Sequence, residues 1–118
     1  MSEMLIIICT CPDDATASKL AGSLVEEQLA ACVNILPGIR SIYRWQGKIS
    51  NDAEVLMVIK SLASRFEELE SWLLEHHPYD VPEIVALPVS SVSAEYHAWV
   101  ESNVDLQGSR RVQMRKHD

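Results

Sequence analysis

Two short segments of this sequence each carry two side chains of the types that bind soft metal ions. Cys9 and Cys11 flank a threonine near the N-terminus, and His76 and His77 are adjacent in the second half of the chain. Thiolate and imidazole groups suit copper or zinc better than magnesium or calcium, which prefer oxygen ligands. Cys9, His76 and His77 are therefore the candidate metal ligands, with Cys11 as a candidate fourth.

The spacing of these residues alone permits a second interpretation. No Cys-x-x-Cys pair is present, and adjacent residues on a helix point about 100° apart. His76 and His77 can therefore share one ion only if Pro78 has already unwound the turn that holds them. In the alternative, Cys9 is a small buried apolar residue, and the histidines lie at a helix C-terminus because an imidazolium favours that end of the dipole. The pattern by itself leaves both interpretations open.

Sequence patterns that are typical of enzymes are weak here. Neither a Walker A motif nor a G-x-G-x-x-G motif occurs. Cys9 or Cys11 could act as a nucleophile beside a histidine, but no orienting carboxylate stands out by its spacing. Asp80 and Glu83 flank Pro82 and could serve as acid and base, although capping and strand-edge solvation explain them equally well. We therefore expect a protein that is not an enzyme.

The composition predicts one soluble globular domain with an acidic surface. The 118 residues include 17 acidic and 10 basic side chains, for a formal net charge of -7. Such a surface repels phosphate backbones, which argues against nucleic acid as a partner. Three cysteines are an odd number, so we expect no disulfide framework and a reducing cytoplasm. No stretch approaches the roughly 20 apolar residues of a membrane span, and no export signal is recognisable, so we expect a cytoplasmic protein without membrane association.

Hydrophobic periodicity and chain-breaking residues predict four strands and three helices. The predicted strands are Met4–Thr10, which we expect to be buried on both faces, Cys32–Trp45, Glu54–Lys60 and Glu83–Val89. The predicted helices begin at a cap on Asp13 or Asp14, at a capping box over Ser64–Glu67, and at a cap on Ser93. The first helix has an apolar stripe of Ala17, Leu20, Ala21, Leu24, Val25 and Leu29, and Pro78 ends the second.

The order of these elements predicts the fold class. It is β-α-β-β-α-β with an extra C-terminal helix, which is the ferredoxin-like α+β pattern built on an antiparallel sheet. We expect one domain over residues 1–103. Residues 104–118 carry four basic and two acidic side chains, and we expect them to form a basic C-terminal tail.

The segment Cys32–Trp45 is too long to lie straight within a compact domain of this size. Its 14 residues would extend about 46 Å, whereas a compact chain of this length has a diameter of about 35 Å. Either Pro37-Gly38 bends it, so that Tyr43 and Trp45 pack on their own domain, or its far end projects as a hairpin. We favour a projecting hairpin whose apolar tip is buried against a neighbouring subunit, which would also remove open sheet edges.

Many segments in order resemble the CutA family, the divalent-cation tolerance proteins. They run from about Leu5 to Asn103 and comprise Cys9-Thr10-Cys11-Pro12-Asp13, Ala15-Thr16-Ala17, Leu29-Ala30-Ala31-Cys32-Val33-Asn34, Leu36-Pro37-Gly38, Ser41-Ile42-Tyr43-Arg44-Trp45-Gln46-Gly47, His76-His77-Pro78-Tyr79-Asp80-Val81-Pro82-Glu83-Ile84, Leu87-Pro88, Tyr96 and Trp99. The residues after Asn103 have no counterpart in the common family pattern.

The resemblance implies a fold, an assembly and a metal. The implied assembly is a very stable homotrimer of ferredoxin-like subunits, similar to the PII signalling proteins. The implied function is a part in tolerance or homeostasis of copper, as Cu²⁺ or Cu⁺, and of other divalent cations, without catalysis. The family's copper ligands correspond here to Cys9, His76 and His77.

A second hypothesis also follows from the resemblance to PII-like trimers. The clefts between subunits could take a small molecule or an unidentified partner protein. Such a cleft would be lined by Tyr43, Trp45, Lys60, Tyr79 and Glu83.

Overall fold

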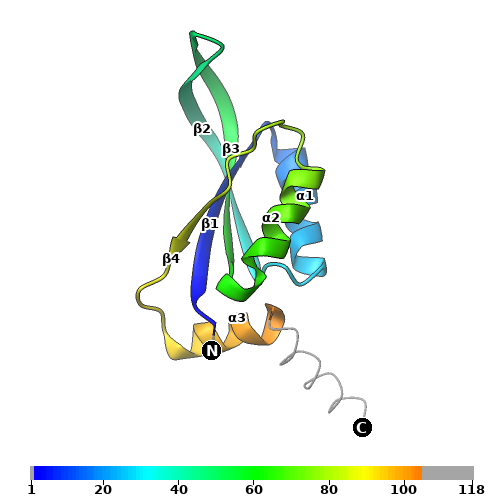
Figure 1. The fold of residues 1–118 in the computed structure, drawn as a ribbon, viewed down its shortest axis with the longest axis vertical. Helices are drawn as coiled ribbons and strands as arrows, with labels where there is room; N and C mark the ends of the chain where they lie inside the picture. Colours follow the sequence, from blue (N-terminus) through cyan, green and yellow to red (C-terminus); the bar gives the residue numbers. More distant parts are fainter. Residues whose placement is uncertain (1, 105–118) are drawn as a thin grey trace.

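A computed structural model describes residues 2–104 of the chain as a four-stranded antiparallel sheet with helices (Figure 1). The elements are β1 (Met4–Cys11), α1 (Asp14–Glu26), β2 (Cys32–Trp45), β3 (Lys48–Leu62), a 3-10 turn (Ala63–Arg65), α2 (Phe66–His76), β4 (Val85–Pro88) and α3 (Ala94–Val104). The strand order is β2-β3-β1-β4, and every neighbouring pair is antiparallel. The predicted ferredoxin-like α+β fold, with its extra C-terminal helix, is confirmed.

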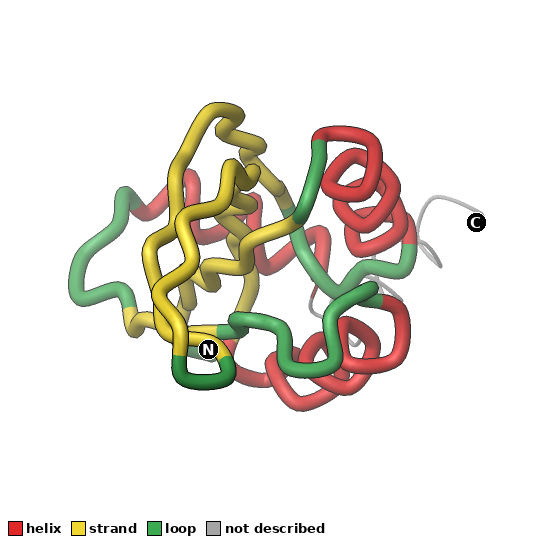
Figure 2. The backbone as a smooth tube through the Cα atoms, turned by 90° about the horizontal axis from the view of Figure 1, so that it is seen from above, coloured by secondary structure: helices red, strands yellow, loops and turns green. Residues whose placement is uncertain are grey.

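Helices α1 and α2 cover one face of the sheet, and the main core lies between the two layers. Seen from above, these helices lie beside the layer of strands (Figure 2). Alternation along β1 turns Ile7, Cys9 and Cys11 toward the helices, where all three are fully buried with Leu24 and Leu69. The candidate cysteines therefore point into the core and not to the surface.

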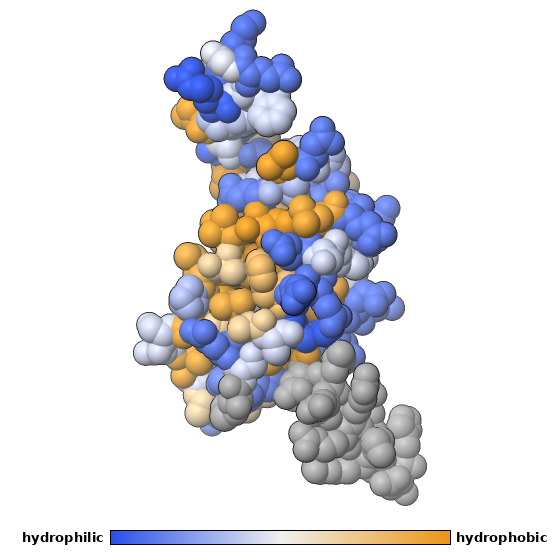
Figure 3. Space-filling model, in the orientation of Figure 1, coloured by the Kyte–Doolittle hydropathy of each residue, from blue (hydrophilic) through white to orange (hydrophobic). Residues whose placement is uncertain are grey.

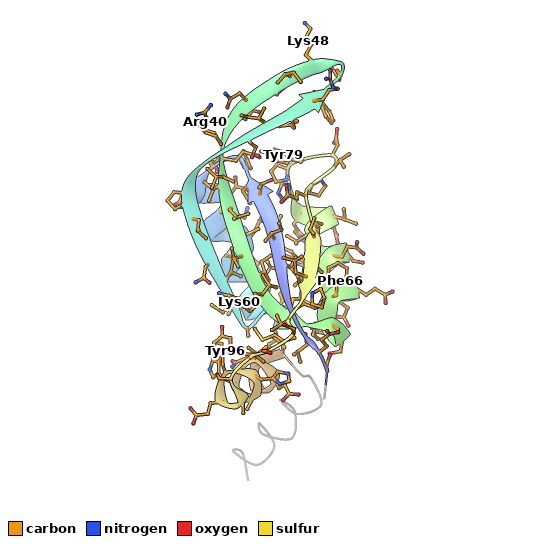
Figure 4. The ribbon with its side chains drawn as sticks, turned by 90° about the vertical axis from the view of Figure 1, so that its left-hand side faces the viewer. Arg40, Lys48, Lys60, Phe66, Tyr79 and Tyr96 are labelled. Carbon is orange, nitrogen blue, oxygen red and sulfur yellow. The ribbon has the colours of Figure 1, made fainter. Side chains whose placement is uncertain are left out.

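The other face of the sheet is largely uncovered in the single chain. Figure 4 looks onto this face, with α1 and α2 behind it, and α3 covers only its lower end. Its apolar side chains follow from the strand registers: Ile6, Ile8, Leu36, Leu56, Val58, Val85 and Leu87. In Figure 3 apolar side chains gather across the middle of the molecule, on the side where β4 lies. The prediction that β1 is buried on both faces therefore holds for one face only in this single chain, because Ile6 and Ile8 are half-buried.

The β2–β3 hairpin projects well beyond the helices and gives the molecule a longest dimension of 58 Å (Figure 1). β2 has its predicted bounds. β3 runs from Lys48 to Leu62 and is longer at both ends than the predicted Glu54–Lys60, because residues before Glu54 also pair with β2. A register shift lies between Leu36 and Ile39, at the predicted Pro37-Gly38 break. The strand therefore continues past an irregularity into a projecting ribbon, and the expectation of a projecting hairpin is met.

The tip of the hairpin is a two-residue turn. Gln46 and Gly47 both have positive φ angles, 50° and 79°, as the turns that match the twist of a hairpin require. Gly47 adopts such an angle without a steric penalty because it has no Cβ.

Several predicted boundaries need correction. Asp13 caps α1 as predicted, by accepting a 2.7 Å hydrogen bond from the Thr16 amide. Two residues of the predicted apolar stripe do not pack as part of the helix: Val25 is exposed, and Leu29 is buried but lies beyond the end of α1 at Glu26. The capping box does not form, because a 3-10 turn precedes α2 and Ser64 makes no side-chain cap. The third helix has the expected cap, since the Tyr96 amide donates to Ser93 Oγ at 3.3 Å.

The C-terminal helix extends one residue beyond the predicted domain boundary. Val104 is fully buried in a second core cluster with Met4, Leu62 and Val100, so it belongs to the domain. The rest of the predicted basic tail, 105–118, lies outside the described residues. Within the described part of the chain, no helix has the length and hydrophobicity that a bilayer crossing requires.

Candidate metal centre

The C-terminal ends of β1 and α2 meet at one end of the core. β1 ends at Cys11 just before Pro12, and α2 ends at His76, since Pro78 forces His77 out of the helical region. His77 has extended backbone angles, φ -73° and ψ 140°, which turn its side chain back toward β1. The sequence therefore brings a strand that carries two thiols against an imidazole from a helix end.

Cys9, Cys11 and His77 form a compact group of metal-ligand atoms. Their ligand atoms all lie within 4.8 Å of one another, and Cys11 Sγ lies 3.9 Å from His77 Nε2. Both cysteines are fully buried and free of disulfides, and His77 is 7% exposed. Two thiolates and one imidazole are a donor set for copper or zinc, so these residues fit the class of metal that the sequence predicts.

The imidazole of His77 is held at both of its nitrogens. The Tyr79 amide donates a 3.1 Å hydrogen bond to His77 Nδ1, so Nδ1 is an acceptor and Nε2 carries the proton. Nε2 in turn donates to the Thr10 carbonyl at 2.8 Å. A metal that binds through Nε2 must therefore displace this proton and replace the bond to Thr10.

The two thiols interact strongly with each other. Hydrogen bonding to Cys11, followed by burial, raises the pKa of Cys9 well above that of an ordinary thiol. The same bond lowers the pKa of Cys11. Cys9 thus holds its proton while Cys11 is the readier thiolate, and a metal that binds both sulfurs must displace the Cys9 proton.

His76 does not join this group. Its Nδ1 lies 2.8 Å from the Trp72 carbonyl one helical turn back, and its ring stacks on Trp72 at a centroid distance of 4.1 Å. His76 is exposed, whereas His77 is buried. The structure therefore brings together Cys9 and His77 of the predicted ligands, replaces His76 by Cys11, and leaves His76 on the surface of α2.

A cleft of about 700 Å³ lies next to this centre, between the end of β2 that leads to the hairpin tip and the loop after α2. Of the five residues predicted to line a cleft between subunits, Tyr43, Trp45, Tyr79 and Glu83 line this cleft within the single chain. Lys60 does not, because it lies at the other end of β3, where its Nζ is 3.9 Å from Cys32 Sγ (Figure 4).

Glu54 is a cleft residue that sequence reasoning did not identify as one. It is 8% exposed, and its carboxylate accepts a 2.6 Å hydrogen bond from the Tyr79 hydroxyl. Burial and this bond raise the pKa of Tyr79. The only signal in the sequence was a carboxylate at the start of a predicted strand, and its partner is 25 residues away.

The chain is similar to known proteins over almost all of its described length. The model of the CutA1 divalent ion tolerance protein family matches residues 5–103. A divalent-cation tolerance protein CutA from Pectobacterium atrosepticum is 46% identical over 104 residues, 88% of this chain and 94% of that protein. A protein of the same name from Thermus thermophilus is 46% identical over 98 residues, 83% of this chain and 95% of its own.

Solved structures show the same fold. The divalent cation tolerance protein from Thermus thermophilus superposes with a TM-score of 0.84 at 44% identity, over 86% of this chain and 98% of its own. CutA from Xylella fastidiosa gives a TM-score of 0.85 at 41% identity, over 87% and 99%. The names of two other relatives give different cellular locations. The protein from Arabidopsis thaliana is called chloroplastic, and the one from Archaeoglobus fulgidus is described as periplasmic.

Proposed function

Because this chain belongs to the CutA1 divalent ion tolerance family, we propose that it is a non-enzymatic, homotrimeric copper-binding protein of metal tolerance or homeostasis. The names of its relatives connect them with tolerance of divalent cations. The observation that carries the proposal is the buried group of Cys9, Cys11 and His77. We place the protein in the cytoplasm, where cysteines remain reduced and able to bind a metal.

Burial supports binding over catalysis. Cys9 and Cys11 have no exposed surface in the single chain, so neither sulfur is positioned to attack a substrate carbonyl or phosphate that binds at the surface. The proposed acid–base pair, Asp80 and Glu83, consists of two exposed side chains on a loop, and neither has the burial that usually tunes a catalytic carboxyl group.

Two features of the surface support a trimer. The open sheet face carries apolar side chains that include Leu36, Val85 and Leu87, which are 42%, 44% and 49% exposed. The projecting hairpin exposes further apolar side chains, among them Ile42 and Trp45. Large exposed apolar areas mark interaction sites, and a closed symmetric assembly would cover both the face and the ribbon.

The metal assignment is tested by calorimetric titration of the reduced protein with copper. We expect about one ion per chain for the natural sequence and none for the triple variant Cys9→Ala, Cys11→Ala, His77→Ala. The His76→Ala variant is the matched control and should bind as the natural sequence does. Unchanged affinity in the triple variant, with its circular dichroism spectrum intact, would contradict the assignment.

A second candidate function rests on the cleft beside the metal group. Tyr43, Trp45 and Tyr79 supply aromatic surface, and Glu54 and Glu83 supply charge, which suits a small molecule or a segment of a partner protein. A PII-like binding module would use this cleft. A thermal-shift screen of small molecules without metal tests this second function. A compound that raises the melting temperature of the natural sequence but not of Trp45→Ala would support it, and no shift with any compound would count against it.

A further inference from the structure

The donor set around the metal group contains another sulfur besides the two thiols. In the β1–β3 register, Met57 lies directly opposite Cys9, and residues paired in this way share one face of the sheet. Met57 is fully buried in the same core cluster as Cys9 and Cys11. A thioether therefore lies on the same buried face as both thiols.

Two carboxylates near the group are engaged elsewhere. The Asp13 carboxylate, just after Cys11, caps α1 through the Thr16 amide, and the Glu54 carboxylate accepts from Tyr79. Within residues 2–104, no Asp or Glu oxygen joins the group of ligand atoms. An ion here would meet sulfur and nitrogen but no carboxylate oxygen.

Burial places a second restriction on which ion can bind to this group. Cys9, Cys11 and Met57 have no exposed surface. A divalent ion held by three protein donors completes its coordination with water or substrate, and Cu²⁺ prefers tetragonal nitrogen and oxygen ligands. Thiolate and thioether ligands instead select Cu⁺, which accepts low coordination numbers and needs no water.

We infer that this centre is specific for a monovalent soft cation, Cu⁺, with Cys9, Cys11 and His77 as ligands and Met57 as an additional thioether donor. The inference rests on the proposed metal-binding function and narrows it to one oxidation state. It departs from the sequence-based prediction in that Cys11 and Met57 are included and His76 is not.

The test uses the full-length chain, reduced and without oxygen, because oxygen would convert Cu⁺ to Cu²⁺, which in turn oxidises thiols. Cu⁺ is titrated against a Cu⁺ chelator, Ag⁺ serves as a stand-in that is not redox-active, and Zn²⁺ is titrated against a zinc dye. We expect about one Cu⁺ or Ag⁺ per chain, with two or three sulfur neighbours in the X-ray absorption spectrum of bound copper. We expect Zn²⁺ to show no tight site.

Met57→Leu is the decisive variant, and Met4→Leu is its control. The exchange nearly conserves volume, so the fold should tolerate it, and Met4 is a buried methionine of the other core cluster. Met57→Leu should weaken Cu⁺ binding by about tenfold, because it removes a thioether donor and loss of even a supporting residue typically costs that much. Met4→Leu should leave the affinity unchanged. Equal Cu⁺ affinity in both variants would overturn the role of Met57.

The outcomes separate this inference from the broader proposal. If Zn²⁺ binds tightly and the triple variant of Cys9, Cys11 and His77 abolishes that binding, the metal site stands and its specificity for Cu⁺ is wrong. If neither monovalent nor divalent ions bind the folded protein, both the inference and the proposed function fail.

Discussion

The Nε2 atom of His77 lies 3.9 Å from the Sγ atom of Cys11, although 66 residues separate the two along the chain. This approach exists because β1 and α2 end at the same corner of the domain and Pro78 turns His77 inward. It makes Cys11, and not His76, the third member of the candidate metal centre. Metal affinity, stability and assembly should therefore respond differently to changes at this corner and on the surfaces around it.

Replacement of Cys11 should remove metal binding without unfolding the domain. We expect Cys11→Ala to lower copper affinity by more than about a hundredfold, since it removes a direct ligand and even supporting residues cost up to that much. Cys32→Ala is the control, because Cys32 lies outside the group. Competition titration measures both, and equal affinities of the two variants would exclude Cys11 as a ligand.

Replacement of His76 should affect stability slightly and metal binding not at all. The ring of His76 stacks on Trp72 at an exposed position, so His76→Ala should cost about 0.5–1.5 kcal/mol of unfolding free energy at most. Urea denaturation gives this cost, and a copper titration of the same sample gives the affinity. A large loss of copper affinity would show that His76 reaches the metal in solution.

Copper affinity should rise with pH. The pKa of Cys9 is raised, chiefly by its hydrogen bond with Cys11, so this thiol keeps its proton at neutral pH and must lose it on binding. Each proton that the metal displaces makes the affinity about tenfold higher per pH unit. Competition titrations across neutral pH measure the slope, and a flat profile would mean that Cys9 is not deprotonated by the metal.

The hydrogen bond between Tyr79 and Glu54 should stabilise the fold. Tyr79→Phe leaves the mostly buried Glu54 carboxylate without the hydroxyl that donates to it, at a cost of about 1–3 kcal/mol. Chemical denaturation at neutral pH measures this loss. An unchanged unfolding free energy would mean that water replaces the tyrosine hydroxyl at no cost.

The same pair predicts a dependence on alkaline pH. Burial, and then the bond to Glu54, raise the pKa of Tyr79 in the folded state. The stabilisation by the protonated phenol is therefore complete below the unfolded pKa of about 10, and it is lost as pH rises toward the folded pKa. The unfolding free energy of the natural sequence should fall more steeply above pH 10 than that of Tyr79→Phe, and parallel curves would contradict this linkage.

A charge on the open sheet face should dissociate the proposed homotrimer. We expect Leu87→Glu, on β4, to sediment as a folded monomer, because a carboxylate buried between subunits is strongly unfavourable. Leu74→Glu is the control, since Leu74 is similarly exposed, at 55%, but lies on α2. A Leu87→Glu variant that sediments like the control would place the interface elsewhere.

Most of the fold could be predicted from local patterns. The periodicity of α1 and the long apolar strands are local signals, and the strand order follows from the ferredoxin-like arrangement. The errors lie where tertiary contacts override local preference. Asn51 and Asp52 continue β3 because β2 pairs with them, and the Ser64 capping box gives way to a 3-10 turn in which the Ser64 amide bonds to Ser2 Oγ.

The candidate site was only half predictable. The types of Cys9 and His77 indicated a metal, and alternation places Cys9 and Cys11 on one face of a strand. Sequence could not decide which of two adjacent histidines turns inward, because that depends on the backbone at His77 just before Pro78. The proximity of Met57 depends on the β1–β3 register, which no local pattern encodes.

The most direct test of the metal centre is a crystal structure of the reduced protein grown with copper in the absence of oxygen. An anomalous difference map collected at the copper edge locates the ion without reference to any assumed ligand. We predict one peak per chain within bonding distance of Cys9 Sγ, Cys11 Sγ and His77 Nε2. A peak at His76 instead, or none in the core of a fully copper-loaded protein, would show that the buried group is not the metal centre.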